Sequence, residues 1–120
     1  MLFIRPFREG DHFDGIAPEP GKGLYYLALD QEALVGWCRW RLSLEKVQIE
    51  EVEDGGDPMT FDGLVRAVLA AALDQGIDRA HFSEKIRPDR LAVSLIPVDS
   101  QNNLISIDYF LNHCKKCKML

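Results

Sequence analysis

The segment EEVEDGGD, residues 50–57, has the residue types and the position of a ligand site. It leads into the helical pattern PMTFDGLVRAVL, in which Pro58 suits the first helical position. In α/β proteins, a loop that enters a helix after a strand is a frequent phosphate site. Here the loop contains no lysine or arginine. It contains the acids Glu50, Glu51, Glu53, Asp54 and Asp57.

These acids make phosphate binding unfavourable. A carboxylate about 4–8 Å from a pyrophosphate costs on the order of 1 kcal/mol at a protein surface. A helix N-terminus returns only about 0.3–1 kcal/mol, so repulsion wins unless the carboxylates point away. A carboxylate-rich cleft instead suits a small-molecule amine or a basic partner, and a solvated strand end is the plainer interpretation of the same residues.

The sequence HCKKC, residues 113–117, holds a single Cys-x-x-Cys pair. A structural zinc site has four ligands, so Cys114 and Cys117 would need Cys38, His12 or His81 close by. We therefore expect no metal site, and Cys114 and Cys117 are the residues that a metal would use. We interpret the pair as part of an exposed tail, and a metal or partner site and a redox pair are the alternatives. A thioredoxin-like redox pair normally stands at a helix start after a strand.

A chain of 120 residues has the length of one domain, and 47% hydrophobic and 28% charged residues are ordinary for a globular protein. The formal net charge of -5 argues against a nucleic-acid binder. No apolar run approaches the roughly 20 residues of a membrane span. Arg5, Arg8 and Glu9 interrupt the apolar stretch that a signal peptide needs. We therefore expect a cytoplasmic protein with free thiols and no membrane partner.

Apolar periodicity and turn residues predict alternating strands and helices. The expected strands are residues 2–7, 24–30, 33–42, 47–53, 79–84 and 104–107, and the expected helices are 58–75 and 88–95, with a terminal turn capped by Asp108. A hairpin followed by a helical crossover predicts an α/β fold with a mixed, mostly antiparallel sheet of about five to seven strands and two or three packing helices. We expect one domain over residues 1–120, with residues 111–120 as a flexible tail.

The strand at 47–53 has an irregular pattern. Val47 and Ile49 share one parity and Val52 has the other, so a regular strand would put Val52 on the opposite face. One extra residue near Glu50 and Glu51 would return all three side chains to the core, which predicts a β-bulge, a feature often found beside active sites. A strand that is buried on both faces, or that ends at Glu50, is the alternative.

In this layout the chain resembles the GNAT superfamily, the acetyl-CoA-dependent N-acetyltransferases. The resemblance covers roughly residues 24–110 and is one of element order. It rests on the hairpin, the strand at 47–53, the long helix ending in DQGID at 74–78, the strand AHFSE and the short helix RLAVSL before Pro97. It implies a GNAT-like fold and acetyl-CoA as the cofactor.

The resemblance also implies a pyrophosphate loop, written Arg/Gln-x-x-Gly-x-Gly/Ala in the family, whose backbone amides hold coenzyme A. The positions in this chain that correspond to it are Val52, Gly55, Gly56, Asp57, Met59 and Phe61. The family's small positions fall on Asp57, Met59 and Phe61, so the motif is not matched. The chain therefore carries a degraded form of this loop.

Two further family positions bear on catalysis. The general base is often a glutamate on the bulged strand, and Glu50, Glu51 or Glu53 could take this role, since partial burial can raise the pKa of a carboxyl group. Many members place a tyrosine in the short second helix to protonate the departing thiolate. That position falls on Ala92, within RLAVSL, which contains no tyrosine.

Two functions are compatible with these residues. A GNAT-like protein that has lost coenzyme A binding would be a ligand- or partner-binding module. An intact one would be an acetyl-CoA-dependent N-acyltransferase acting on a small amine. The loop chemistry and Ala92 favour the first function, and the layout favours the second. The apolar hairpin and the final strand also predict a homodimer.

Overall fold

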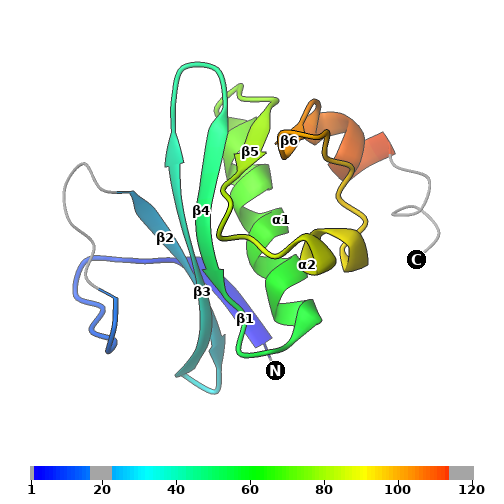
Figure 1. The fold of residues 1–120 in the computed structure, drawn as a ribbon. Helices are drawn as coiled ribbons and strands as arrows, with labels where there is room; N and C mark the ends of the chain where they lie inside the picture. Colours follow the sequence, from blue (N-terminus) through cyan, green and yellow to red (C-terminus); the bar gives the residue numbers. More distant parts are fainter. Residues whose placement is uncertain (1, 17–22, 114–120) are drawn as a thin grey trace.

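The computed structural model describes residues 2–16 and 23–113 of the chain. Six strands form one sheet in the order β1-β2-β3-β4-β5-β6, so neighbours along the chain are also neighbours in the sheet (Figure 1). The strands are β1 (Leu2–Pro6), β2 (Leu24–Asp30), β3 (Ala33–Leu42), β4 (Val47–Glu53), β5 (Ala80–Phe82) and β6 (Asn103–Leu104). The helices are α1 (Pro58–Asp74), α2 (Pro88–Val93) and the π-helical turn η1 (Tyr109–His113).

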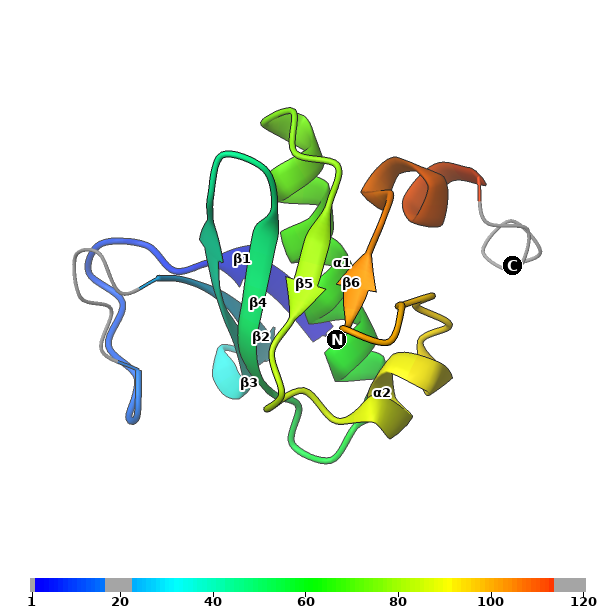
Figure 2. The same cartoon turned by 45° about the horizontal axis from the view of Figure 1, so that its top comes forward.

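The sheet is mixed, which confirms the predicted α/β class. β1 to β4 are joined antiparallel, β4 and β5 are parallel, and β5 and β6 are antiparallel. β4 and β5 are parallel because α1 returns the chain to the end of the sheet where β4 began. Figure 2 shows β4, β5 and β6 side by side with α1 against them. Gln31 and Glu32, with φ of 52° and 73°, form the tight turn of the predicted hairpin.

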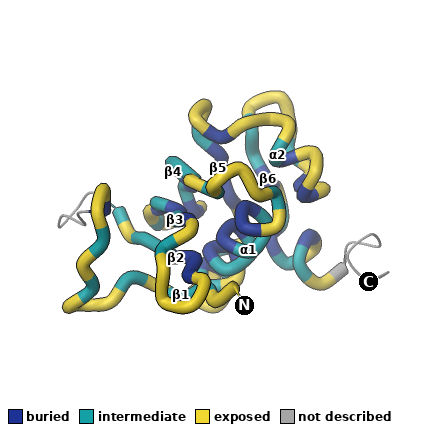
Figure 3. The backbone as a smooth tube through the Cα atoms, turned by 90° about the horizontal axis from the view of Figure 1, so that it is seen from below, coloured by how far each residue is buried: buried dark blue, intermediate teal, exposed yellow. Residues whose placement is uncertain are grey.

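The main core lies between α1 and one face of the sheet. The buried side of α1 is formed by Phe61, Leu64, Val65, Val68, Leu69 and Ala72. Facing them are Cys38 and Trp40 of β3, Val47 and Ile49 of β4, and Phe82 of β5. Figure 3 shows the buried residues gathered along α1 and the middle strands. This packing fixes α1 against the strands that carry the candidate site.

The other face of the sheet is covered by residues 7–16, which follow β1. Ile16 packs there on Leu27 of β2. Trp37 joins this second cluster, whereas Trp40 belongs to the main core, so the two tryptophans lie on opposite faces of β3. The sheet is therefore apolar on both sides in its first three strands.

An ion pair ties this covering segment to β1. Arg5 donates to the two carboxylate oxygens of Asp11 at 2.7 and 2.9 Å, and the backbone N–H of Arg8 donates to Asp11 at 2.7 Å. The hydrogen bonds from Arg5 and Arg8 lower the pKa of Asp11 to about 2. This carboxylate is therefore ionised, and its ion pair complete, above a pH of about 4.

The bulge predicted in β4 is present. The ladder between β3 and β4 skips Glu50, because Arg39 pairs with Glu51 and the next residue of β3 pairs with Ile49. The extra residue returns Val52 to the main core, on the same side as Ile49.

The last strand is shorter than expected. β6 comprises Asn103–Leu104 instead of residues 104–107. The N–H of Ile107 donates to the carbonyl oxygen of Asp78 at 2.8 Å, which draws the chain away from the ladder with β5.

Two helix ends also differ in detail. α2 ends at Val93 rather than at residue 95. Ser106 provides the cap expected of Asp108, since its Oγ accepts from the N–H of Tyr109 at 3.1 Å. Residues 114–120 lie outside the described part of the chain, so the flexible tail stays a prediction. Within the described residues, every helix is too short or too polar to cross a membrane.

We predict that Gly36→Ala destabilises the fold. A Cβ at Gly36 of β3 would lie 2.6 Å from the carbonyl oxygen of Glu53 and 2.9 Å from Cγ2 of Thr60, so β3 and α1 would have to separate. Such overpacking lowers the free energy of unfolding by about 1–3 kcal/mol, measurable by urea denaturation.

Gly63→Ala is the matched control for this prediction. Its Cβ would meet the end of the Ile4 side chain, which can rotate, and alanine is a better helix former than glycine. If both variants lost the same free energy of unfolding, the close contact between Gly36 and Glu53 would not be what limits the side chain at Gly36.

Candidate functional site

A cleft opens where β4 and β5 separate. The parallel ladder joins only Val47–Ile49 to Ala80–Phe82. Just beyond it, Ser83 donates from its N–H to the carbonyl oxygen of Ile49 at 2.9 Å and from Oγ to that of Glu50 at 2.5 Å. The chain then turns towards α2 while β4 continues (Figure 2). A cleft of about 260 Å³ lies between the end of β4 and the segment after β5.

The cleft has two walls of different chemistry. One wall is the end of β4 with the acidic loop, and the other is formed by residues 85–90. Phe61 of α1 and Ile86, which are 2% and 3% exposed, supply its apolar floor. The remaining lining residues are Val52, Glu53, Asp54, Gly56, Lys85, Arg87 and Arg90.

Val52 presents its backbone to the cleft. On the β5 side of β4, Val47 donates to Arg79 and Ile49 accepts from Ser83. Backbone groups alternate between the two edges of a strand, and the bulge shifts this alternation by one residue. The N–H and C=O of Val52 therefore point into the cleft, where no strand of the described chain is paired with β4. This open edge can form main-chain hydrogen bonds with a ligand.

The loop amides donate to the loop's own carboxylates. The N–H of Gly55 donates to Glu53 Oε1 at 2.9 Å, and the N–H of Gly56 donates to Asp54 Oδ1 at 2.8 Å. The two glycines have φ of 63° and 83°, a left-handed turn that few other residues adopt. Glycine is therefore required here by the turn itself.

Asp57 closes the start of α1 in the same way. Its Oδ1 accepts from the N–H of Met59 at 3.1 Å, and its Oδ2 accepts from Oγ1 of Thr60 at 2.9 Å. Pro58 has no N–H to offer. Asp57 is thus the N-cap of α1 and stands where an anionic ligand of this helix would stand.

An ion pair joins the two walls of the cleft. Nε of Arg90, in α2, donates to Oδ2 of Asp54 at 2.8 Å, and the two side chains are only 12% and 14% exposed. The other oxygen of Asp54 accepts from Gly56. One carboxylate therefore holds both the loop and α2 in place.

The second wall supplies cations that the sequence did not reveal as part of the site. Lys85 and Arg87 lie at the rim and are 62% and 64% exposed. The hydrogen bond from Arg87 lowers the pKa of Asp89, and Nζ of Lys85 lies 3.9 Å from Glu51. The available signal was the basic segment KIRPDR at residues 85–90, but nothing local places that segment against the loop.

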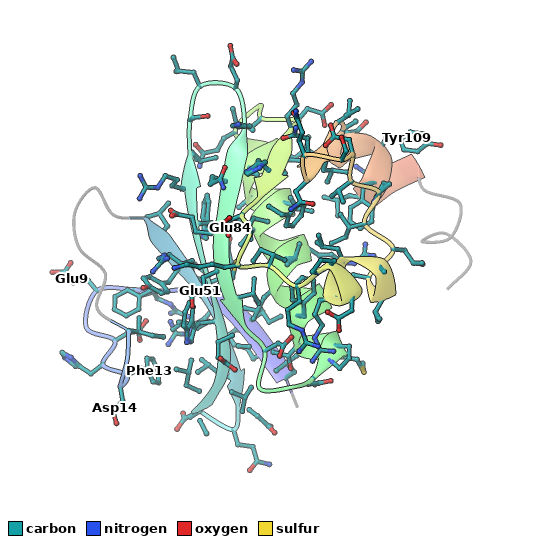
Figure 4. All side chains as sticks on the ribbon, in the orientation of Figure 1. Glu9, Phe13, Asp14, Glu51, Glu84 and Tyr109 are labelled. Atoms are coloured by element: carbon teal, nitrogen blue, oxygen red, sulfur yellow. The ribbon has the colours of Figure 1, made fainter. Side chains whose placement is uncertain are left out.

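The three candidate bases point in different directions. Glu50 accepts from Nε of Arg41 at 2.7 Å. Glu51 lies 3.4 Å from Nη2 of Arg39, on the side of the sheet away from α1 (Figure 4). Glu53 lines the cleft, but its carboxylate caps the loop. Each carboxylate therefore has one oxygen engaged by a neighbour, and only that of Glu53 faces the cleft.

The structure describes Cys38 and His81, two of the residues considered for metal binding. These contain no cluster of three or more His, Cys, Asp or Glu side chains that could hold a metal ion. Burial raises the pKa of the Cys38 thiol far above its ordinary value. Nδ1 of His81 lies 2.8 Å from Oε1 of Gln48. Cys114 and Cys117 lie outside the described residues.

Comparison with known proteins supports the fold. A scan against protein-family models finds no match, and a search of curated protein sequences finds none. Among solved structures, a GNAT family acetyltransferase from Elizabethkingia anophelis with acetyl-CoA bound is 13% identical and aligns at a TM-score of 0.60, over 78% of this chain and 72% of that one. YhhK, a candidate N-acetyltransferase of E. coli bound to coenzyme A, is 13% identical and aligns at 0.56, over 88% of this chain and 98% of that one.

This chain has a GNAT-like fold. The resemblance inferred from the order of its elements is thereby confirmed at the level of architecture. At 13% identity the likeness concerns the fold, so the chemistry of the cleft must be argued from this chain's own residues.

We predict that the ion pair between Arg90 and Asp54 has a coupling energy of about 1–2 kcal/mol, more than an ordinary surface ion pair. Removal of either side chain would leave the charge of the other one poorly hydrated. A double-mutant cycle with Arg90→Met and Asp54→Asn, followed by urea denaturation, measures this coupling energy. The control cycle uses Arg87 and Asp89, which are 64% and 57% exposed, and should give less than about 0.5 kcal/mol. Equal coupling in both cycles would contradict a structural role for the Arg90–Asp54 pair.

Proposed function

We propose that this protein is a ligand- or partner-binding module with a GNAT-like fold, in which the loop's own carboxylates close the pyrophosphate site. One observation carries the proposal: three loop amides already have intramolecular acceptors. These pairs are Gly55 with Glu53, Gly56 with Asp54, and Met59 with Asp57. The family resemblance implies that amides at this place hold the pyrophosphate of coenzyme A.

A pyrophosphate would have to displace these carboxylates. Each hydrogen bond to a charged group contributes about 1.5–3 kcal/mol, and the phosphate oxygens would only replace what is lost. The displaced carboxylates stay close to the phosphate because they belong to the same loop. Each of them repels it by on the order of 1 kcal/mol. The bound ligand also loses translational freedom, which an internal carboxylate does not. The balance favours the closed loop.

The rest of the cleft favours a different mode of binding. Val52 offers an unpaired strand edge, Phe61 and Ile86 offer an apolar floor, and Lys85 and Arg87 offer a charged rim. A ligand or partner segment that bonds to the strand edge would use all three. The acids of β4 and the loop favour an amine or a basic group where the ligand faces them, and Lys85 and Arg87 favour an acidic group at the rim.

The cationic rim also gives a second candidate function some support. An acetyl-CoA-dependent N-acyltransferase could hold the donor's phosphates with Lys85 and Arg87 in place of the loop amides. Its substrate would be a small amine, and its base would be Glu50, Glu51 or Glu53. The solved structures with acetyl-CoA or coenzyme A bound make this the natural alternative.

Calorimetric titration of acetyl-CoA, with coenzyme A as control, separates the two functions. At low ionic strength we expect no heat of binding at ligand concentrations up to about 1 mM, because the loop amides are occupied. A micromolar dissociation constant that is lost in the variant Lys85→Gln/Arg87→Gln would instead establish the acyltransferase mode of donor binding. Amine substrates could then be screened by release of free thiol.

Neutralising the loop should open it to the cofactor. In Glu53→Gln/Asp54→Asn/Asp57→Asn the neutral amide oxygens accept weaker capping bonds, which a phosphate can displace, and three negative charges are removed. At about 1 kcal/mol per charge, acetyl-CoA affinity should rise on the order of 100-fold, measured by the same titration.

The control for this prediction is Glu9→Gln/Asp14→Asn/Glu45→Gln, which makes the same change in net charge at exposed residues. Glu9 and Asp14 lie in the segment after β1, and Glu45 precedes β4, whereas the loop follows β4. It should leave the affinity unchanged within about threefold once salt is added. Equal gains in the two triple variants would mean that overall charge, and not the loop, limits binding.

A further inference from the structure

A second hollow, of about 480 Å³, lies beside the edge strand β1, on the face of the sheet away from α1. It shares no lining residue with the cleft between β4 and β5. We call it the β1 hollow, and it is lined by Phe3, Arg5, Phe13, Leu29, Gln31 and Glu32. Pockets for small ligands commonly have volumes of about 300–1,000 Å³. The β1 hollow therefore has the size of a site for a small molecule.

Half of this lining is apolar. Leu29 of β2 is 7% exposed and belongs to the second core cluster, against which Phe13 packs from the segment after β1 (Figure 4). Phe3 of β1 is the cross-strand neighbour of Leu29, yet it is 57% exposed. Residues directly opposite each other in an antiparallel pair lie on the same face of the sheet. An apolar group in the β1 hollow would therefore cover Phe3 and Leu29 together.

The arginine of the β1 hollow is already neutralised. The guanidinium of Arg5 donates to both carboxylate oxygens of Asp11 at 2.7 and 2.9 Å, and to the carbonyl oxygen of Pro6 at 3.0 Å. The side chains of Arg5 and Asp11 are only 15% and 16% exposed, so solvent screens their attraction little. An anionic ligand would have to compete with a carboxylate that the chain itself holds in place.

Glu32 gives the β1 hollow an uncompensated negative charge. In the described part of the chain, no hydrogen bond or ion pair engages its carboxylate. The pair of Arg5 and Asp11 adds no net charge to it. An ammonium group beside Glu32 would gain the attraction of this carboxylate. The two phenylalanines of the hollow also attract a cation, because the faces of aromatic rings are negative.

The turn holds Glu32 in a backbone conformation that favours other residues. Gln31 and Glu32 are the central residues of the turn between β2 and β3, and their φ angles are 52° and 73°. A two-residue turn with positive φ at both positions strongly favours Asn-Gly. Other residues in this conformation cost stability, and they are concentrated at functional sites. The carboxylate thus stands at the β1 hollow although glycine would give a more stable turn.

We propose that the β1 hollow binds a small ammonium ion with an apolar body. The ammonium group pairs with Glu32, and the apolar body covers Phe3 and Leu29. A neutral ligand would gain the apolar contact alone, and a carboxylate would be repelled by Glu32. The net charge of -5 also draws cations to the protein. This site is additional to the cleft and does not depend on what the cleft binds.

Titration with three ligands that share one hydrocarbon chain tests the proposal. These are n-hexylammonium, n-hexanol and n-hexanoate, and binding is followed by the amide signals in two-dimensional NMR spectra. We expect n-hexylammonium to shift the signals of Leu29, Gln31 and Glu32 with a Kd of about 1 mM or lower. This Kd should be at least about fivefold below that of n-hexanol, with n-hexanoate the weakest. Tighter binding of n-hexanol or n-hexanoate overturns the proposal, and so do shifts confined to the cleft.

Glu32→Gln and the control Glu45→Gln each remove one negative charge from a hairpin turn. Glu32→Gln should weaken n-hexylammonium binding about fivefold and change n-hexanol binding less than about twofold. Glu45→Gln should leave both unchanged, because Glu45 lies outside the β1 hollow. The proposal is wrong if Glu32→Gln has no effect, or if both variants weaken n-hexylammonium binding equally.

Glu32→Gly separates the ligand from the fold. It should raise the melting temperature by about 2–6 °C, because glycine suits the positive φ of the turn, and it should abolish the preference for n-hexylammonium over n-hexanol. Glu32→Gln should abolish the same preference without this gain in melting temperature. A lower melting temperature in Glu32→Gly would assign the carboxylate to the fold instead of to a ligand, and would overturn the proposal.

Discussion

β4 is bonded to β3 along its whole length but to β5 only over Val47–Ile49. The bulge at Glu50 lies where the second ladder stops, and an extra residue bends a strand and increases its twist. β5 therefore does not follow β4 any further, and the chain after Ser83 turns towards α2 instead. The cleft, the open edge at Val52 and the approach of α2 to the acidic loop all depend on this one separation.

Inside that cleft, carboxylates take the role that the architecture offers to a ligand. A helix start and a glycine turn present N–H groups, and such groups bind any acceptor of suitable charge and reach. Glu53, Asp54 and Asp57 are close enough in sequence to reach them without a partner. Asp54 in addition balances the charge of Arg90, so removal of the acids would alter both the loop and the position of α2.

Local sequence pattern predicted the elements well and the site only in part. The hairpin, α1 and the bulge could be inferred because parity and helical spacing act over a few residues. The cationic wall could not, since Arg90 meets Asp54 across 36 positions of sequence. The short β6 has the same origin: it depends on Asp78 binding the backbone near Ile107, a contact that no local pattern encodes. Of the acids singled out in the sequence, Glu53 and Asp54 line the cleft, and their hydrogen bonds to the glycine amides appear only in three dimensions.

A binding site that is incomplete without its ligand makes the folded state more stable as the ligand concentration rises, by mass action. In this loop the acceptors are part of the polypeptide, and they are present at the same effective concentration in every molecule. As long as the carboxylates of Glu53, Asp54 and Asp57 occupy these amides, the loop is ordered without any help from solution. The order of this loop then needs no bound nucleotide, because each of these amides already has its acceptor within the chain.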